Sequence, residues 1–134
     1  MTEAEFSWPL RVYIEDTDAG GIVYYVNYLK YMERARTEFM REQGFGKDYV
    51  FNLNLMFVVR DVQINYQLPA RLDDELQATA RVIEVGAANI VFEQAVLRGA
   101  ESLAQAQVNI VSVRRDNTRP TRVPAAIRSA LSTA

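Results

Sequence analysis

The acidic segment from Glu15 to Gly21 holds the side chains best suited to chemistry, because two carboxylates, Asp16 and Asp18, are closely followed by a pair of glycines. A carboxylate in such a turn-rich loop can act as a general base or a nucleophile, and the pattern also looks like the start of a calcium loop. A calcium loop that begins at Asp16 needs an oxygen ligand at its fifth position and a glutamate at its twelfth, but these positions hold Gly20 and Asn27. The spacing argues against a metal site and leaves two alternatives, a reactive carboxylate or one that only caps a turn or helix.

The absence of two residue types narrows the remaining chemistry. The sequence contains no Cys and no His, which excludes disulfides, thiolate nucleophiles, Cys-ligated zinc and His-dependent triads. An enzyme built on this chain must therefore use carboxylates, hydroxyls, Arg or Lys, backbone dipoles or a bound cofactor.

Length and charge predict one soluble domain. The 134 residues suit a single hydrophobic core, and a net charge of -2 gives no reason to expect a nucleic acid as partner. The N-terminus has no basic apolar signal pattern, and no apolar run approaches the ~20 residues that span a bilayer. We expect a cytoplasmic protein of one domain, residues 1–134, without membrane insertion.

An amphipathic helix after the acidic segment is the clearest element in the sequence. Its apolar residues recur at the spacing of one helix face, and charged residues mostly occupy the other side. Asn27 is the expected N-cap, and Gly44 and Gly46 end the helix after about four turns. The predicted apolar face consists of Tyr28, Tyr31, Met32, Ala35 and Phe39.

Five stretches alternate apolar and polar residues with the period of a strand. Short connections join the last four, so antiparallel pairing is expected. A sheet with one apolar face needs a cover, and the single long helix supplies it, which predicts an α+β domain with a curved sheet around one helix. Residues 56–59 are apolar on both faces, which favours an oligomer. The alternating stretches are Trp8–Ile14, Val62–Leu68, Leu76–Val82, Ile90–Val96 and Ala104–Ile110.

The stretch from Val12 to Tyr28 resembles the signature of the 4-hydroxybenzoyl-CoA thioesterase family, in particular its YbgC-like branch of acyl-CoA thioesterases. The resemblance continues through residues 31–38, 57–60 and 69–74. It implies the hotdog fold, a five-stranded antiparallel sheet wrapped around one long central helix. It also implies hydrolysis of an acyl-CoA thioester, no cofactor beyond the coenzyme A of the substrate, and a homodimer or homotetramer with the active site at the dimer interface.

The resemblance assigns the reacting groups to two positions. Asp18 is the implied nucleophile or general base, and sequence does not separate these two routes. The backbone N–H of Tyr25, at the start of the long helix, is the implied donor to the oxyanion. The YbgC-like branch usually has His at this position and the hydroxybenzoyl-CoA branch has Tyr, which leaves the acyl group open. Gly20 and Gly21 would let the thioester approach the backbone closely.

Further substrate contacts are implied at Tyr28, Glu33 and Arg60. Each has a simpler alternative: core packing for Tyr28, a solvated helix carboxylate for Glu33, and an ordinary surface arginine for Arg60. Other candidates for the coenzyme A phosphates are Arg71, Arg114, Arg115, Arg119 and Arg122.

Two other functions remain for a chain of this resemblance. A hotdog dehydratase or hydratase uses a His with an acidic partner, and a chain without His argues against it. A non-catalytic module that binds acyl-CoA or an acyl carrier protein is the second alternative, and the intact Asp18 loop argues against it.

Overall fold

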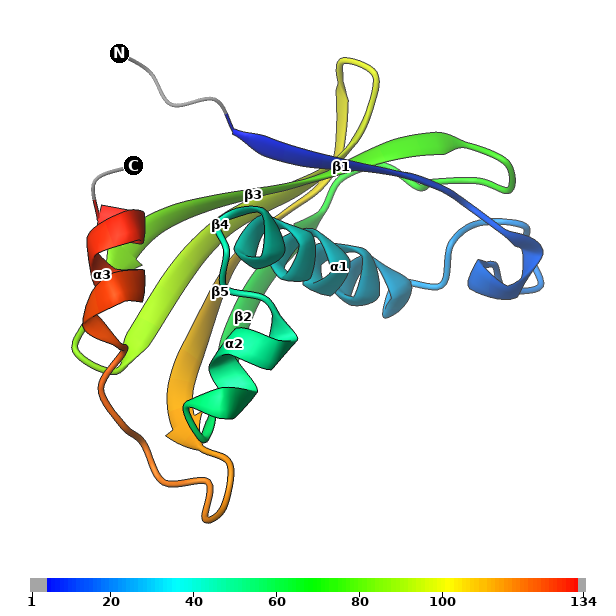
Figure 1. Cartoon of the computed structure of the whole chain (residues 1–134). Coiled ribbons are helices and arrows are strands. Elements are labelled where there is room, and N and C mark those ends of the chain that lie inside the picture. The colour runs from blue at the N-terminus through cyan, green and yellow to red at the C-terminus, as the bar shows by residue number, and fades with distance from the viewer. Residues whose placement is uncertain (1–4, 133–134) are drawn as a thin grey trace.

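The computed structural model describes residues 5–132, in which a five-stranded antiparallel sheet curves around one long helix (Figure 1). The strand order is β1-β3-β4-β5-β2, and every neighbouring pair is antiparallel. The predicted α+β class and hotdog fold are confirmed. The strands are β1 (Phe6–Arg11), β2 (Leu55–Tyr66), β3 (Glu75–Val85), β4 (Asn89–Arg98) and β5 (Glu101–Arg114), and the helices are α1 (Asn27–Glu42), α2 (Lys47–Asn52) and α3 (Ala125–Ser132).

Helix α1 lies in the concave side of the sheet, chiefly against β3, β1 and β4. All five residues of its predicted apolar face are buried. The Phe39 ring makes edge contacts with Phe6 of β1 and Phe92 of β4, at centroid distances of 5.9 and 5.8 Å. Gly44 follows the helix with φ of +93°, as expected for a glycine that ends a helix. The 3.6-residue period thus predicted both the helix and the face it buries.

Three elements differ from the sequence prediction. Strand β1 ends at Arg11, and a short 3-10 turn, Ile14–Asp16, begins where the strand was expected to continue. The second predicted strand starts earlier, because residues 56–59 belong to β2. Residues Lys47–Asn52, for which no element was predicted, form α2, whose six residues are too few to show a helical period.

Strand β2 is one edge of the sheet and is bent by a β-bulge at Arg60. Val59 pairs with Ile110 and Asp61 pairs with Asn109, so Arg60 is the extra residue on β2. A bulge bends the strand and redirects side chains next to it. Exposed Val59 shows that this edge still presents apolar surface.

The remaining segments close the far end of the sheet. Helix α3 buries Ile127 and Leu131, and the Val123 amide donates to the carbonyl of Ala87 in the β3–β4 turn. Helix α3 begins directly after Pro124. No helix within residues 5–132 is long and apolar enough to cross a membrane.

Candidate active site

The acidic loop that carries Asp18 turns back on itself through backbone hydrogen bonds. The Asp18 amide donates to the Ile22 carbonyl at 2.9 Å, and the Gly21 amide donates to the Asp18 carbonyl at 3.0 Å. Gly21 has φ of +80°, a conformation that glycine adopts without steric cost. The Asp18 carboxylate is exposed, and its one hydrogen bond within residues 5–132 comes from the Gly20 amide to Oδ1, at 2.8 Å. The loop therefore presents a carboxylate whose second oxygen is open to a substrate or water.

Two hydrogen bonds to the Asp16 carbonyl fasten this loop to the start of α1. The Tyr24 amide donates at 2.9 Å and the side-chain amide of Asn27 donates at 2.8 Å. Asn27 is the first residue of α1, and the N-cap is Val26, whose side chain makes no capping bond. The predicted N-cap role of Asn27 is wrong, because its buried side chain is a donor to the loop rather than an acceptor for the helix.

The turn that leads into α1 leaves two backbone amides free. The Tyr24 carbonyl accepts from the Asn27 amide at 2.8 Å, and the Tyr25 carbonyl accepts from the Tyr28 amide at 3.3 Å. Within residues 5–132 the amides of Tyr25 and Val26 donate to no protein atom, as is usual for the first N–H groups of a helix. They lie at the positive end of the helix dipole, so the geometry suits a developing negative charge.

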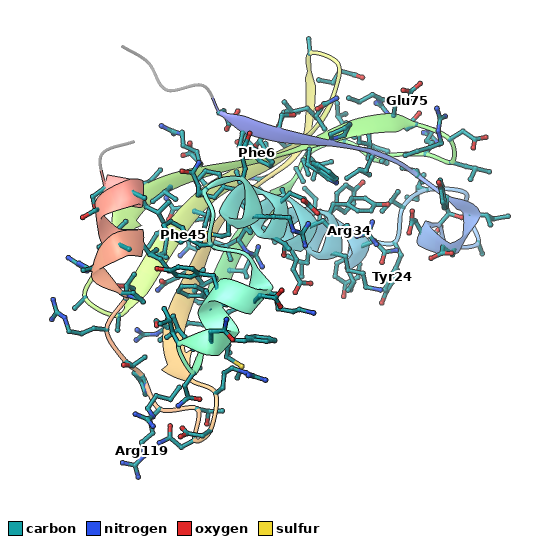
Figure 2. The ribbon with its side chains drawn as sticks, viewed as in Figure 1. Phe6, Tyr24, Arg34, Phe45, Glu75 and Arg119 are labelled. Atoms are coloured by element: carbon teal, nitrogen blue, oxygen red, sulfur yellow. The ribbon has the colours of Figure 1, made fainter. Side chains whose placement is uncertain are left out.

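A cluster of tyrosines surrounds this turn, and two of them bond to distant backbone. Tyr28 is 3% exposed, and its hydroxyl accepts a hydrogen bond from the buried Ala70 amide at 2.9 Å. The Tyr66 hydroxyl, at the end of β2, donates to the Tyr25 carbonyl at 3.2 Å. Figure 2 shows Tyr24 at this same end of α1. The burial of Tyr28 favours its packing role, and a contact with substrate remains a prediction.

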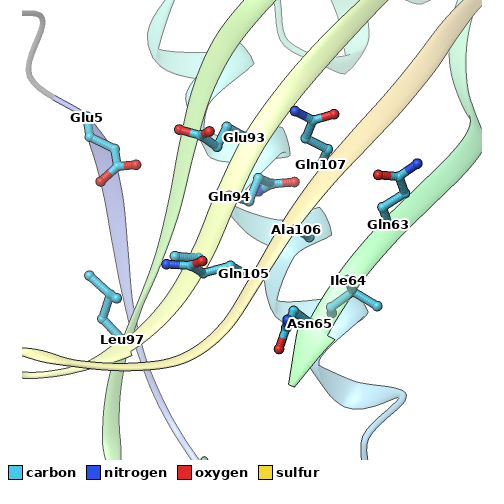
Figure 3. Close-up of a pocket in the computed structure, with 11 residues that line it drawn as sticks. Glu5, Gln63, Ile64, Asn65, Glu93, Gln94, Leu97, Gln105, Ala106 and Gln107 are labelled. Atoms are coloured by element: carbon cyan, nitrogen blue, oxygen red, sulfur yellow. The ribbon is translucent and has the colours of Figure 1, made fainter. Parts of the chain in front are cut away.

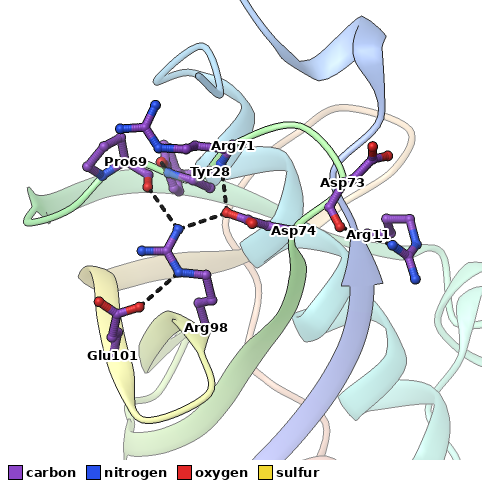
Figure 4. Close-up of polar contacts among 9 residues, drawn as sticks. Arg11, Tyr28, Pro69, Arg71, Asp73, Asp74, Arg98 and Glu101 are labelled. Atoms are coloured by element: carbon purple, nitrogen blue, oxygen red, sulfur yellow. Dashed lines mark hydrogen bonds and ion pairs between the residues drawn. The ribbon is translucent and has the colours of Figure 1, made fainter. Parts of the chain in front are cut away.

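An arginine network holds the loop before β3, which in turn contacts the acidic loop (Figure 4). Arg98 donates to Asp74 at 2.8 Å, to the Pro69 carbonyl at 3.2 Å and to Glu101 at 2.9 Å. Burial opposes ionisation of Asp74, but hydrogen bonds from the Arg71 amide and the Arg98 side chain hold its pKa below the ordinary value. Arg71 forms an isolated β-bridge with Ile22. The network therefore holds the loop before β3, which pairs with the acidic loop at Ile22.

The fold does not bring Glu33 and Arg60 next to Asp18 within one subunit. Glu33 is exposed on α1, eight residues beyond Tyr25, roughly 12 Å along the helix axis. Arg60 is exposed on β2, six residues before Tyr66, roughly 20 Å along the strand. Glu33 and Arg60 each lie near the middle of their element, α1 and β2 respectively.

An apolar groove of about 650 Å³ runs between α1, α2 and the first half of β2, with Glu33 at its border. Arg36 reaches into this groove, and its Nη1 donates to Oε1 of Gln94 at 2.9 Å. Burial lowers the pKa of the Arg36 guanidinium, and nearby Glu33 opposes that shift. Gln94 is itself fixed, because its amide nitrogen donates to the carbonyls of Met32 and Thr79, each at 2.9 Å. The groove thus has largely apolar walls, with Arg36 held in place by Gln94.

A second concave region, of about 620 Å³, lies on the outer face of the sheet (Figure 3). Its floor carries the carboxamides of Gln63, Gln105 and Gln107 on β2 and β5. None of the predicted site residues lines it. Within residues 5–132 no group of three or more acidic side chains is placed to hold a metal ion.

Sequence reasoning missed Tyr66, Ala70 and Asp16 as parts of the site's support. Tyr66 was assigned to the apolar face of a strand, and that alternation correctly indicates that it faces α1. The partners of its hydroxyl and of the Ala70 amide lie 41 and 42 residues away along the chain. No local pattern contains such a pairing.

A curved antiparallel sheet around one helix, with an acidic loop that leads into that helix, defines the chain as a hotdog-fold protein. Residues 12–131 match the family model described as "Thioesterase-like superfamily", and the chain belongs to this superfamily.

Curated relatives agree with the family assignment over nearly the full length. The "Acyl-CoA thioesterase YbgC" of Haemophilus influenzae is 40% identical over 131 residues, which cover 97% of this chain and 96% of the relative. The "Acyl-CoA thioester hydrolase YbgC" of Escherichia coli O6:H1 is 38% identical over 128 residues, 95% of this chain and 96% of the relative. The predicted resemblance to YbgC-like thioesterases is confirmed.

Solved structures agree on the fold. A probable thioesterase from Bartonella henselae superposes with a TM-score of 0.86 at 35% identity, over 90% of this chain and all of that chain. A 1,4-dihydroxy-2-naphthoyl-CoA thioesterase from Synechocystis superposes with a TM-score of 0.86 at 19% identity, over 96% of each chain. The latter likeness concerns the fold alone.

Proposed function

We propose that this protein hydrolyses an acyl-CoA thioester to the free acid and coenzyme A. Water supplies the oxygen of the acid, the C–S bond breaks, and the thiol leaves with a proton. The Asp18 carboxylate either attacks the carbonyl carbon to give an anhydride that water then opens, or removes a proton from the attacking water. The Tyr25 amide donates to the carbonyl oxygen as negative charge develops on it.

One observation carries this proposal: the loop with the exposed Asp18 carboxylate is hydrogen-bonded to the helix start that has the free backbone amides. The Asp16 carbonyl ties the loop of Asp18 to the first turn of α1 through Tyr24 and Asn27. A thioester hydrolase needs a base or nucleophile on one side of the carbonyl and a donor on its oxygen. The names of the YbgC relatives support acyl-CoA as the substrate class.

A free-thiol assay over short, long and aromatic acyl-CoAs tests the proposal. We expect turnover on at least one substrate and a loss of at least ~100-fold in Asp18→Asn, the scale of an essential acid–base or nucleophilic group. Asp48→Asn, an exposed aspartate on α2, is the matched control and should keep full activity. Full activity in Asp18→Asn would move the chemistry to another residue. No turnover across the panel would favour a non-catalytic acyl-CoA or acyl-carrier-protein binding module.

We further propose that the working unit contains a second copy of this chain along the edge of β2. The strand is 12 residues long, and exposed Val58 and Val59 lie beside the apolar groove. A long apolar edge strand is normally covered or paired. Antiparallel pairing of two β2 strands about Arg60 and Asp61 would place opposite charges across the contact. It would also bring the groove of one copy, with Glu33, to the Tyr66 end of the other.

Light scattering at micromolar concentration tests this assembly. A homodimer or homotetramer is expected for the wild type, and Val59→Glu should shift the protein toward monomer and lower its activity. Ile83→Glu, at an exposed apolar position on β3, is the matched control and should leave the assembly intact. A wild-type monomer with full activity would contradict a shared site.

We expect arginine contacts to the coenzyme A phosphates. Among the predicted candidates, Arg71 is the one whose backbone pairs with the acidic loop, at Ile22. Arg114 is paired with Asp116, and Arg115 stacks on the Phe51 ring at 3.8 Å. We therefore propose Arg71 as a phosphate contact from the same subunit. A cytoplasmic location, where acyl-CoA would be the substrate, stays a prediction.

A further inference from the structure

The hydroxyl of Tyr66 reaches the backbone of the turn that bears the free amides. Tyr66 is the last residue of β2, and its hydroxyl donates to the Tyr25 carbonyl at 3.2 Å. Its ring makes edge contacts with Tyr25 and Tyr28, at centroid distances of 5.9 and 5.5 Å. The ring is therefore held on two sides, so that the hydroxyl points at one carbonyl.

Neither hydrogen bond to the Tyr25 carbonyl is short, since 3.2 Å from the Tyr66 hydroxyl is also long for an O–H···O bond. The Tyr25 carbonyl also accepts from the Tyr28 amide, but that bond is 3.3 Å long, at the weak end of the range for N–H···O bonds. The preceding carbonyl, of Tyr24, is held by a 2.8 Å bond from the Asn27 amide. The peptide group between Tyr25 and Val26 is thus the less firmly held of the two whose N–H groups are free.

We propose that Tyr66 is a positioning residue of the thioester site, whose hydroxyl holds the Tyr25 carbonyl and thereby orients the Val26 N–H of the same peptide group, beside the free Tyr25 N–H, toward the substrate oxygen. The inference rests on the proposed function, and Tyr66 itself touches no reacting atom. The Tyr25 carbonyl and the Val26 N–H belong to one peptide group, so a donor on the oxygen also polarises that N–H. An oxyanion donor works only if it is held in place before the reaction.

The protonation state of Tyr66 agrees with a donor role. Burial, and then the nearby Tyr25 and Tyr28 side chains, raise the pKa of Tyr66 above its ordinary value. The hydroxyl therefore keeps its proton at neutral pH. Because Tyr66 ends the edge strand, its bond also links the position of β2 to the geometry of the turn.

Tyr66→Phe tests the inference, because it removes the hydroxyl and keeps the ring contacts. Loss of one neutral hydrogen bond at a partly exposed site should lower kcat about 3- to 10-fold and leave KM within about twofold. Tyr49→Phe, which removes an exposed hydroxyl from α2, should keep the wild-type kcat. Amide NMR supplies a readout independent of turnover: loss of the bond to the Tyr25 carbonyl should shift the Val26 nitrogen signal upfield. A 3-fluorotyrosine at position 66, a stronger donor of nearly the same size, should shift it the other way.

The outcomes separate this inference from the proposed function. A fall in kcat at constant KM together with the Val26 shift supports the positioning role. A wild-type kcat in Tyr66→Phe, while Asp18→Asn is inactive, would overturn it and leave the proposed function standing. A change of kcat and KM together with a lower thermal unfolding temperature in Tyr66→Phe would also overturn it. The substitution would then act by destabilising the fold and not by reorienting the amide. If the wild type turns over no acyl-CoA, the proposed function fails, and this inference fails with it whatever the NMR shift.

Discussion

Replacement of Gln94 by Leu removes a buried side chain that joins α1 to the sheet. Gln94 lies on β4, is 1% exposed, and makes three hydrogen bonds through one carboxamide. Its nitrogen donates to the Met32 carbonyl of α1 and the Thr79 carbonyl of β3, and its oxygen accepts from Arg36. Leu has a similar size, so the change deletes hydrogen bonds with little change of volume.

The expected loss of stability follows from those three bonds. Each of the two neutral bonds contributes about 1 kcal/mol, and the bond from the Arg36 cation about 1.5–3 kcal/mol. The Met32 and Thr79 carbonyls belong to a helix and a strand, where ladder bonds reduce the cost of losing a second donor. Arg36 has no carboxylate within 4 Å among residues 5–132, so its half-buried guanidinium would lose its neutral partner. We expect a total loss of about 3–5 kcal/mol in the free energy of unfolding.

Urea unfolding followed by circular dichroism measures this loss. Gln107→Leu, an exposed position on β5, is the matched control and should change stability by less than about 0.5 kcal/mol. The double variant Arg36→Leu/Gln94→Leu should recover part of the loss, because it removes the unpaired cation as well. A loss below about 1 kcal/mol in Gln94→Leu, or no recovery in the double variant, would refute the reasoning.

Two further outcomes follow from the loops around the site. Gly21→Ala places a side chain at φ of +80° and should cost about 1–2 kcal/mol and lower turnover. Gly44→Ala, at φ of +93° after the C-terminal end of α1, should cost a similar amount and keep turnover. Equal turnover in both variants would show that the acidic loop tolerates a shift. Asp74→Asn should destabilise the protein at pH 7, and the difference from wild type should shrink below about pH 4. The folded state lowers the pKa of Asp74, so its carboxylate stabilises the fold at any pH above the pKa of the unfolded state. That stabilisation is lost as the pH falls through the pKa of the folded state. A difference that stays constant from pH 7 to pH 3 in urea titrations would contradict the Arg98–Asp74 contribution.

The parts of the fold that sequence predicted are those decided by local period. Ile90, Phe92, Gln94 and Val96 alternate along β4, and all four are buried. That alternation predicted even the polar Gln94 on the inner face of the sheet. It could not identify the hydrogen-bond partners of the Gln94 side chain. The end of β1 escaped prediction because distant partners decide it. The Val12 amide still donates to the Asp74 carbonyl in the β1–β3 register, but the ladder stops there because β3 begins at Glu75.

The same division holds within the candidate site. Asp18 and its glycines form a local turn, which the spacing of the residues already indicated. The bulge at Arg60 was not predictable, because a bulge depends on the register with β5 and not on residue type. Whether Arg60 and Glu33 touch substrate depends on a second copy of the chain, and one sequence carries no direct record of such a contact.

The two reacting groups of the proposed site are therefore held by different kinds of structure. Asp18 depends on neighbours within four residues, through the bonds of Gly20, Gly21 and Ile22. The donor turn depends on Tyr66 through the peptide group of the Tyr25 carbonyl and the Val26 N–H, and Tyr66 belongs to an edge strand far along the chain. A disturbance of the β2 edge should consequently weaken the oxyanion donor before it moves the carboxylate. A single hydrogen bond connects that edge to the Tyr25 carbonyl, whereas the acidic loop has its own support from Asp16 and from the Arg98 network. If two copies pair along β2, the same hydrogen bond couples dimerisation to the geometry of the oxyanion donor. The reason is that β2, which would contact the partner, ends at Tyr66, which orients the donor.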